Sequence, residues 1–266
     1  MTFHMFKDMI DQFVALGGGC LYISPTVGEA LIDTKLHEKL RYAKRFPELS
    51  EIHLYTNGIL LTRKRFEELT TAGVDFVNVS TSGFDAGEYE RVYRVKSYKK
   101  VLGNLYQISS SPLFSRCKVE IGLRSDSLFP AMKPDYKRLK GLGYSISRTL
   151  FFDNWSGRIK ENNLPGCMFI RPLRKKPVPC HMLYAGPMVQ QDGSIVACGC
   201  RDLEADSELY LGNIDNIFLK SAWFSKEMHH IRRRFIEGTP PRICRDCRHY
   251  APVSIDKLKN DFNVLA

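Results

Sequence analysis

The sequence predicts an α/β fold followed by a small cysteine-rich domain. Over the first 150 residues, short apolar runs alternate with stretches of helical periodicity. Five of the eight cysteines fall after residue 179, and two of them form a C-x-x-C pair. Alternation of this kind is typical of parallel βα units, which form either an open sheet or part of a βα barrel.

The elements of the N-terminal part follow one another regularly. Polar capping residues and glycines bound the helices, as Thr62 and Gly73 do for the segment 62–73. After a first helix over 1–16, we expect strands at 19–27, 51–60, 74–83, 117–126 and 144–152 and helices at about 34–46, 62–73, 85–111 and 134–143. Five consecutive units of this kind predict a parallel sheet.

The character of the sequence changes after residue 152. Residues 153–179 contain prolines and glycines without any period, which indicates a linker. Farther on, an Asp192-Gly193 turn between apolar runs predicts a hairpin, and residues 221–238 predict one helix. We therefore expect three parts: a βα part over 1–152, a linker over 153–179 and a cysteine-rich domain over 180–266.

Four cysteines of the last part can close one metal site. The predicted hairpin brings Cys180 and Cys198 together, and the C-x-x-C pair, a knuckle after two prolines, supplies Cys244 and Cys247. Four thiolates suit either a structural zinc ion or a four-cysteine iron–sulfur cluster, and the spacing does not choose between them. Cys200 is a fifth candidate, because alternate residues of an extended strand point the same way. The other three are expected to be unligated core thiols: Cys20, Cys117 and Cys167.

The composition restricts the compartment and the kinds of binding partner that we expect. The chain has no apolar run of 18 residues and no signal peptide, so we expect a cytoplasmic protein without a membrane span. A net charge of +10 suits an anionic partner, but solvated basic faces explain it equally well. A zinc-ribbon that binds nucleic acid would explain the charge and the C-x-x-C pair but not the βα units. We therefore do not expect a nucleic-acid partner.

The cysteines of the last part stand in a specific order. Cys180, Gly193 and Cys198 give C-x12-G-x4-C, which is followed by LGNI at 211–214 and C-R-D-C at 244–247. This order resembles the SPASM/twitch auxiliary-cluster domain found at the C-terminus of radical SAM enzymes. No cysteine follows the C-x-x-C pair, so the one-cluster twitch form is the better match. The resemblance implies one auxiliary [4Fe–4S] cluster with four ligands: Cys180, Cys198, Cys244 and Cys247.

Motifs at the ends of the predicted strands resemble the S-adenosylmethionine (SAM) site of the radical SAM barrel. A Gly-Glu pair follows the first strand, T-N-G at 56–58 lies near the end of the second, and polar side chains lie on the third and fourth. N-W-S-G at 154–157 resembles the N-W-x-G between barrel and auxiliary domain. The resemblance implies that five residues bind SAM: Gly28, Glu29, Ser80, Ser82 and Arg124.

One family motif is absent from the sequence. Radical SAM enzymes hold the cluster that cleaves SAM on a C-x-x-x-C-x-x-C segment after the first barrel strand, and these 266 residues contain none. The resemblance thus implies a partial (β/α) radical SAM barrel whose first strand is missing, followed by a small α+β SPASM/twitch cluster domain. Because an unpaired strand edge is costly, we expect either that a partner chain covers the open edge of the barrel or that the protein is prone to aggregate. A truncated chain, a misplaced start codon and a natural cluster-less relative all explain the absence.

Two functions follow from the resemblance. The first is a radical SAM oxidoreductase or peptide-modifying enzyme that uses SAM and the auxiliary cluster on a peptide or a sugar-like substrate. The second is a cluster-less accessory protein that binds a peptide or a partner through its auxiliary domain. The missing motif favours the second for the chain as it stands.

Overall fold

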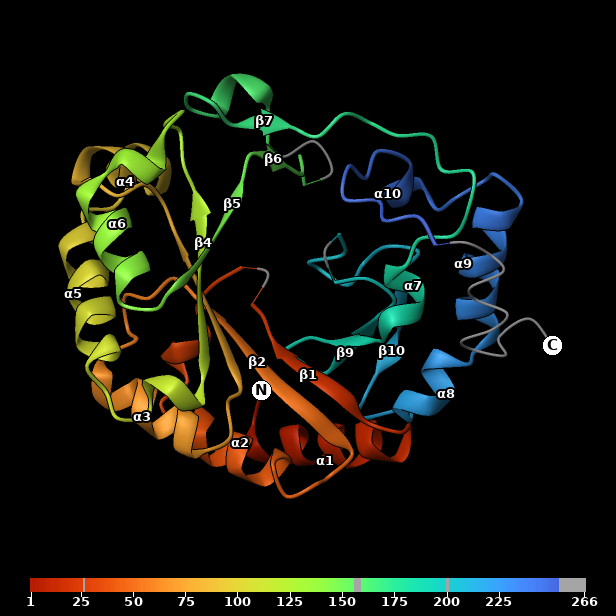
Figure 1. Cartoon of the computed structure of the whole chain (residues 1–266). Coiled ribbons are helices and arrows are strands. Elements are labelled where there is room, and N and C mark those ends of the chain that lie inside the picture. Colours follow the sequence, from red (N-terminus) through yellow and green to blue (C-terminus); the bar gives the residue numbers. More distant parts are fainter. Residues whose placement is uncertain (26, 156–158, 200, 254–266) are drawn as a thin grey trace. The chain divides into compact units, whose positions relative to one another are not determined.

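The computed structural model describes residues 1–25, 27–155, 159–199 and 201–253, and it divides into two compact units (Figure 1). The sheet unit comprises residues 17–151 and 162–169. The cysteine unit comprises residues 1–16, 152–161 and, of the described C-terminal residues, 170–253. Along the chain, the sheet unit thus carries the predicted SAM motifs and the cysteine unit carries the predicted metal ligands.

A five-stranded parallel sheet forms the centre of the sheet unit, in the sequential order β1-β2-β3-β4-β5. The strands are β1 (Gly19–Ile23), β2 (Leu49–Thr56), β3 (Phe76–Thr81), β4 (Lys118–Arg124) and β5 (Ser145–Thr149). The connections contain η1 (Ala30–Ile32), α2 (Leu36–Ala43), α3 (Arg63–Thr71), α4 (Ala86–Tyr93), α5 (Tyr98–Ser109), η2 (Phe114–Arg116), η3 (Pro130–Met132) and α6 (Pro134–Gly141). The predicted α/β class is confirmed, and β1 and β5 form the two edges of the sheet.

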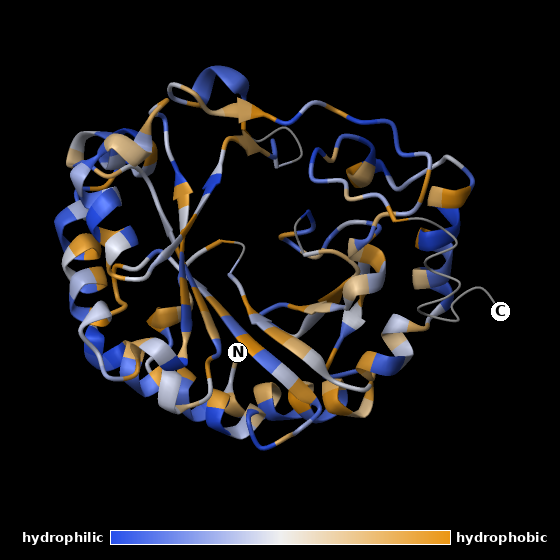
Figure 2. Cartoon of the chain, in the orientation of Figure 1, coloured by the Kyte–Doolittle hydropathy of each residue, from blue (hydrophilic) through white to orange (hydrophobic). Residues whose placement is uncertain are grey.

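The two faces of this sheet differ in chemistry. Side chains alternate between buried and half-buried along β3, where Val77 and Val79 are fully buried. Hydropathy alternates along β2 and β4 in the same way (Figure 2). The apolar face packs under the helices. The opposite face carries aromatic and polar groups, among them Tyr22, Glu51, His53, Tyr55 and Asn78.

Local capping decides where the helices of the sheet unit begin and end. The hydroxyl of Thr62 accepts a hydrogen bond from the Arg65 amide at 3.2 Å, which confirms the predicted N-cap of α3. The segment 85–111, expected to be helical over most of its length, contains two helices. Arg94 adopts a left-handed conformation with φ 58°, which ends α4, and α5 starts anew at Tyr98.

The cysteine unit is built from short elements. They are α1 (Phe3–Ala15), α7 (Met182–Ala185), β8 (Met188–Val189), β9 (Ser194–Val196), β10 (Tyr210–Asn213), α8 (Leu219–Trp223), α9 (Lys226–Ile236) and α10 (Arg242–Arg245). The three strands form an antiparallel sheet in the order β10-β9-β8, and Gly193 turns the β8–β9 hairpin with φ +89°. The single helix expected over 221–238 is two helices, because the Ser225 side chain caps α9 by accepting from the Met228 amide.

The first helix belongs by its contacts to the cysteine unit. Met5, Met9 and Phe13 of α1 pack against the apolar core of that unit. The side-chain oxygen of Gln12 also accepts a hydrogen bond from the Leu219 amide at 2.6 Å, at the start of α8. The predicted domain limits put this helix in the βα part over 1–152. Those limits remain a prediction.

The segment predicted as a linker, 153–179, contains short elements or lies next to them. Strands β6 (Phe151–Phe152) and β7 (Phe169–Ile170) pair with each other, and η4 (Glu161–Asn163) lies between them in sequence. Across the described residues, no helix combines the length and the apolar character needed to span a bilayer.

Candidate metal centre and cofactor site

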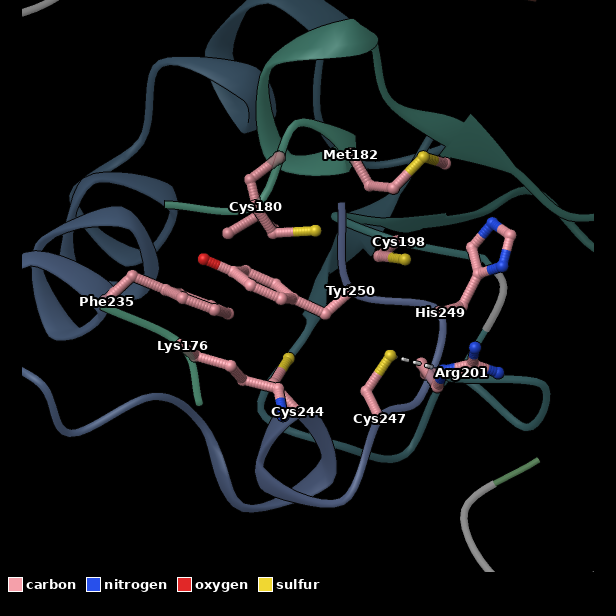
Figure 3. A pocket seen from close by; sticks show the side chains of 11 residues that line it. Lys176, Cys180, Met182, Cys198, Arg201, Phe235, Cys244, Cys247, His249 and Tyr250 are labelled. Carbon is pink, nitrogen blue, oxygen red and sulfur yellow. Dashed lines mark hydrogen bonds between the residues drawn. The ribbon is translucent and has the colours of Figure 1, made fainter. Parts of the chain in front are cut away.

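All four predicted metal ligands line one pocket of the cysteine unit (Figure 3). Cys180 precedes α7, Cys198 follows β9, and Cys244 and Cys247 lie in and just after α10. Three basic residues share the lining, and no carboxylate is among the described residues that form it. The remaining lining residues are Lys176, Met182, Leu183, Arg201, Phe235, His249 and Tyr250.

Cys180 is positioned by the end of the described chain and not by the hairpin. Its backbone forms an isolated antiparallel bridge with Pro252, and the amide of Val253 donates to the Pro179 carbonyl at 3.0 Å. The first arm of the predicted hairpin is interrupted by α7. The expectation that the hairpin itself brings Cys180 to Cys198 is therefore wrong, although the two thiols do share the pocket.

The C-x-x-C knuckle is a tight turn that a proline sets. The Pro241 carbonyl accepts from the amide of Cys244 at 2.9 Å, and the Cys244 carbonyl accepts from the amide of Cys247 at 3.2 Å. Burial, reinforced by the nearby thiols of Cys247 and Cys180, raises the pKa of Cys244 to about 12. A bound cation would offset this cost and deprotonate the thiol.

The four cysteines form a donor set for a metal centre. Among the described residues, one group of three or more metal-ligating side chains gathers within 4.8 Å, and it contains none of these four cysteines. Four thiolates suit either a zinc ion or a four-cysteine iron–sulfur cluster.

A buried ion pair stands beside the knuckle. The Nε of Arg201 donates to the Sγ of Cys247 at 2.9 Å, and its guanidinium pairs with Asp153 at 2.6 Å. These two side chains are only 3% and 7% exposed. The arrangement supplies positive charge to a cysteine that must be a thiolate to bind metal. Sequence reasoning missed both residues, although Arg201 in the C-G-C-R-D segment was the available signal.

The predicted SAM motifs lie at the carboxyl ends of neighbouring strands, where parallel α/β sheets bind ligands. The Glu29 carboxylate accepts from the Asn57 amide at 2.7 Å and from the Thr56 hydroxyl at 2.8 Å. The Gly-Glu and T-N-G motifs are thus joined directly. Gly28 adopts φ +106°, a conformation that L side chains rarely adopt, with open space where a Cβ would stand.

The three other predicted SAM residues come from β3 and β4. Ser82 is fully buried, and its hydroxyl has no hydrogen-bond partner among the described residues. A buried polar atom of this kind fits a site that a ligand completes. Ser80 shares a hydrogen bond of 3.1 Å with the Tyr93 hydroxyl. Arg124 is exposed at the end of β4.

Glu88 is a buried carboxyl that the sequence did not single out. It accepts from the Ser125 hydroxyl at 2.5 Å and from the Asp126 amide at 2.9 Å, and so fixes the segment that follows β4. Burial, together with the nearby Asp126, raises its pKa. Gly83 leaves room for it, because a Cβ there would lie 2.3 Å from the Glu88 carboxyl carbon.

The remaining cysteines lie elsewhere. Cys117 is buried, as expected of a core thiol, whereas Cys20 and Cys167 are half-buried, and none of the three lines the pocket. Cys200 and residues 156–157 of the N-W-S-G motif lie outside the described residues.

Family models match both parts of the chain. The radical SAM superfamily model matches residues 1–122, and the model of the SPASM iron–sulfur cluster-binding domain matches residues 180–248. The chain is a radical SAM protein with a C-terminal SPASM domain. The predicted family and the order of its two domains are confirmed, and the radical SAM and SPASM families imply SAM and iron–sulfur clusters as cofactors.

Curated relatives of this radical SAM protein are considerably longer. GTP 3',8-cyclase of Lactiplantibacillus plantarum is 30% identical over 116 residues, which cover 44% of this chain and 34% of that protein. GTP 3',8-cyclase of Chlorobaculum tepidum is 31% identical over 96 residues, covering 36% and 29%. The matched region thus spans about a third of the length of these relatives.

Solved radical SAM structures share the fold. BtrN in complex with AdoMet and 2-DOIA superposes with a TM-score of 0.61 at 18% identity, covering 93% of this chain and 80% of that one. Native anSMEcpe with bound AdoMet and Kp18Cys peptide gives 0.56 at 15% identity, covering 94% and 81%. At this level of identity the similarity establishes the architecture alone.

Proposed function

We propose that the cysteine unit holds one auxiliary [4Fe–4S] cluster, that the sheet unit binds SAM, and that the protein belongs to an enzyme that modifies or oxidises a peptide or sugar-like substrate by radical chemistry. The observation that carries the proposal is the gathering of Cys180, Cys198, Cys244 and Cys247 around one pocket. Two further observations support the proposal: these cysteines form no group of three gathered within 4.8 Å among the described residues, and a buried arginine donates to one of the sulfurs.

Each group of residues has a distinct part in this proposal. When bound, the cluster supplies a one-electron redox centre and SAM supplies the radical precursor. The four cysteines bind the cluster, and Arg201 compensates the negative charge of their thiolates. Glu29 orients the segments after β1 and β2 around the ligand, and Ser82 offers it a buried hydroxyl. Arg124 provides a cation for the SAM carboxylate.

Two structural neighbours support the proposed substrate classes. One was solved with a bound peptide and the other with 2-DOIA, so a peptide and a sugar-like compound are the two classes that we propose for this chain. The curated relatives are named GTP 3',8-cyclases, but they match less than half of this chain, so we do not propose their substrate for it.

The second function is an accessory protein that binds a peptide or partner without cleaving SAM. This function does not require a C-x-x-x-C-x-x-C segment, and the 266 residues contain none. Among the described strands β1 pairs with β2 alone, so its other edge is where a partner chain would pair. An enzyme needs the three-cysteine segment in addition to these residues.

Metal analysis after anaerobic purification tests the cluster. We expect about four iron and four sulfide per chain with little zinc. Cys198→Ala should lose the iron, whereas Cys117→Ala, which alters a buried thiol outside the pocket, should retain it. Zinc without sulfide in the unaltered chain would show that the proposal of an iron–sulfur cluster is wrong.

Reductive cleavage of SAM separates the two functions. The chain and a version extended upstream with the genomic sequence are incubated with SAM and a strong reductant, and 5'-deoxyadenosine is measured. If the protein is part of an enzyme, we expect the extended version to cleave SAM and the chain alone to cleave none. If the extended version carries no three-cysteine segment and cleaves no SAM, the accessory function stands.

A further inference from the structure

Three metal-ligating side chains of different chemistry meet on the polar face of the sheet unit. Cys20 lies on β1, and Glu51 and His53 lie on β2. The thiol sulfur, a carboxylate oxygen and an imidazole nitrogen of these residues all lie within 4.8 Å of one another. None of them belongs to the four-cysteine pocket or to the predicted SAM motifs.

Strand register fixes this meeting. In the parallel β1–β2 pair, Cys20 is opposite Glu51, and Tyr22 is opposite His53. Because side chains two residues apart on a strand share a face, Glu51 and His53 both point to the side on which Cys20 lies. The three donors are therefore held by paired backbone, and only side-chain rotation is needed to adjust them around an ion.

Aromatic neighbours restrict the histidine ring. The ring of His53 meets the ring of Tyr22 edge-on with centroids 5.0 Å apart, and its centroid lies 4.8 Å from that of Phe76. These contacts limit the orientation of one of the three donors before any ligand binds.

The same site has one open side. The side chain of His53 is 17% exposed, whereas that of Glu51 is 59% exposed, so an ion can enter past the carboxylate. At present the His53 Nε2 and a Glu51 oxygen pair with each other at 2.5 Å. That contact explains why the side chains of His53 and Glu51 lie together. It does not explain why the Cys20 thiol lies within 4.8 Å of both.

We propose that Cys20, Glu51 and His53 bind a divalent transition-metal ion of the zinc class, with a fourth position open to water or to another ligand. One thiolate, one imidazole and one carboxylate form a mixed donor set that zinc accepts, and three protein ligands leave its tetrahedral shell incomplete. Binding replaces the contact between Glu51 and His53. It releases to solvent the thiol proton of Cys20 and, from the imidazolium form of His53, one ring proton as well. This inference does not depend on the proposed function, because it uses none of the auxiliary ligands.

Cobalt(II) is the probe for the test, since it takes zinc sites and reports thiolate ligation by a charge-transfer band. The full chain, with its auxiliary site loaded beforehand, is titrated anaerobically in the unaltered form and as Cys20→Ser and His53→Gln. Cys117→Ser is the matched control, because it removes a thiol of the same unit that lies outside the three-residue group.

We expect the unaltered chain and Cys117→Ser to bind one more cobalt ion than Cys20→Ser. The charge-transfer band should be lost in Cys20→Ser, and the affinity should fall at least about tenfold in His53→Gln, as expected when a metal site loses a ligand. Circular dichroism checks that each variant is folded. If Cys20→Ser does not fold, His53→Gln alone tests the proposal. Equal stoichiometry and affinity in the unaltered chain and the folded variants would overturn the proposal.

Discussion

The Nε of Arg201 donates a hydrogen bond to the Sγ of Cys247 at 2.9 Å, from a guanidinium that Asp153 holds at 2.6 Å. Asp153 also accepts from the amide of Arg248, the residue after Cys247, at 3.1 Å. One carboxylate thus fixes both the arginine and the backbone beside the cysteine. Removing either partner of this pair would leave an unpaired buried charge.

Arg201→Gln should lower the reduction potential of the auxiliary cluster while leaving its iron content unchanged. Hydrogen bonds to the sulfurs stabilise the more negative, reduced cluster, so losing one makes reduction harder. We expect a shift of tens of millivolts, since about 60 mV corresponds to about 1.4 kcal/mol for one electron. Potentiometry followed by electron paramagnetic resonance measures it. The exposed Arg174→Gln is the control, and an equal shift there would show a general charge effect instead.

Removing the cluster should loosen the cysteine unit and spare the sheet unit. The cysteine unit consists of short elements, and its ligands come from three separate segments that the metal cross-links. We expect chelation under reducing conditions to destabilise this unit by at least about 3 kcal/mol. Hydrogen exchange with mass spectrometry would show faster exchange in α7, α9 and α10 and unchanged exchange in β2, β3 and β4. Uniform loss of protection would contradict a local role for the metal.

Glu29→Gln should weaken SAM binding about tenfold without unfolding the chain. Both carboxylate oxygens of Glu29 accept hydrogen bonds, so an amide would place an NH₂ group against a donor from Thr56 or Asn57. The segments after β1 and β2 would then lose their common anchor. Equilibrium dialysis with labelled SAM measures the affinity. Glu48→Gln changes an exposed carboxylate of the same unit, and it should bind SAM as the unaltered chain does.

Glu88→Gln should remove a pH dependence of stability. Burial raises the pKa of Glu88 in the folded chain above its ordinary value of 4.5, so the folded state binds more protons than the unfolded state between the two values. The stability of the unaltered chain should therefore fall relative to Glu88→Gln as the pH rises through that window, and then level off. Urea denaturation between about pH 4 and pH 7 measures the difference in unfolding free energy between the unaltered chain and Glu88→Gln. The contributions of the other titratable groups cancel in this difference. A constant difference across this range would contradict the raised pKa.

Local signals in the sequence predicted the sheet unit well. Alternating apolar residues, the Thr62 cap and the Gly73 stop were enough to locate the strands and α3. They did not locate the breaks that single residues make. Arg94 separates α4 from α5 within the helical segment 85–111 through its left-handed backbone, and Ser225 divides the predicted helix over 221–238 by capping α9. Both events depend on the backbone conformation of one residue, which periodicity does not report.

The sequence by itself determined the family and the parallel α/β class, and it singled out the four cysteines that line one pocket, because order and spacing along the chain carry this information. Only the tertiary structure decided what surrounds them. Cys180 is placed by a bridge to Pro252, and Arg201 meets Cys247 and Asp153 from different parts of the sequence. The pairing of Cys20 with Glu51 likewise follows from the β1–β2 register. Contacts between distant segments are set by packing and strand pairing over the whole unit, and a linear pattern contains no record of them.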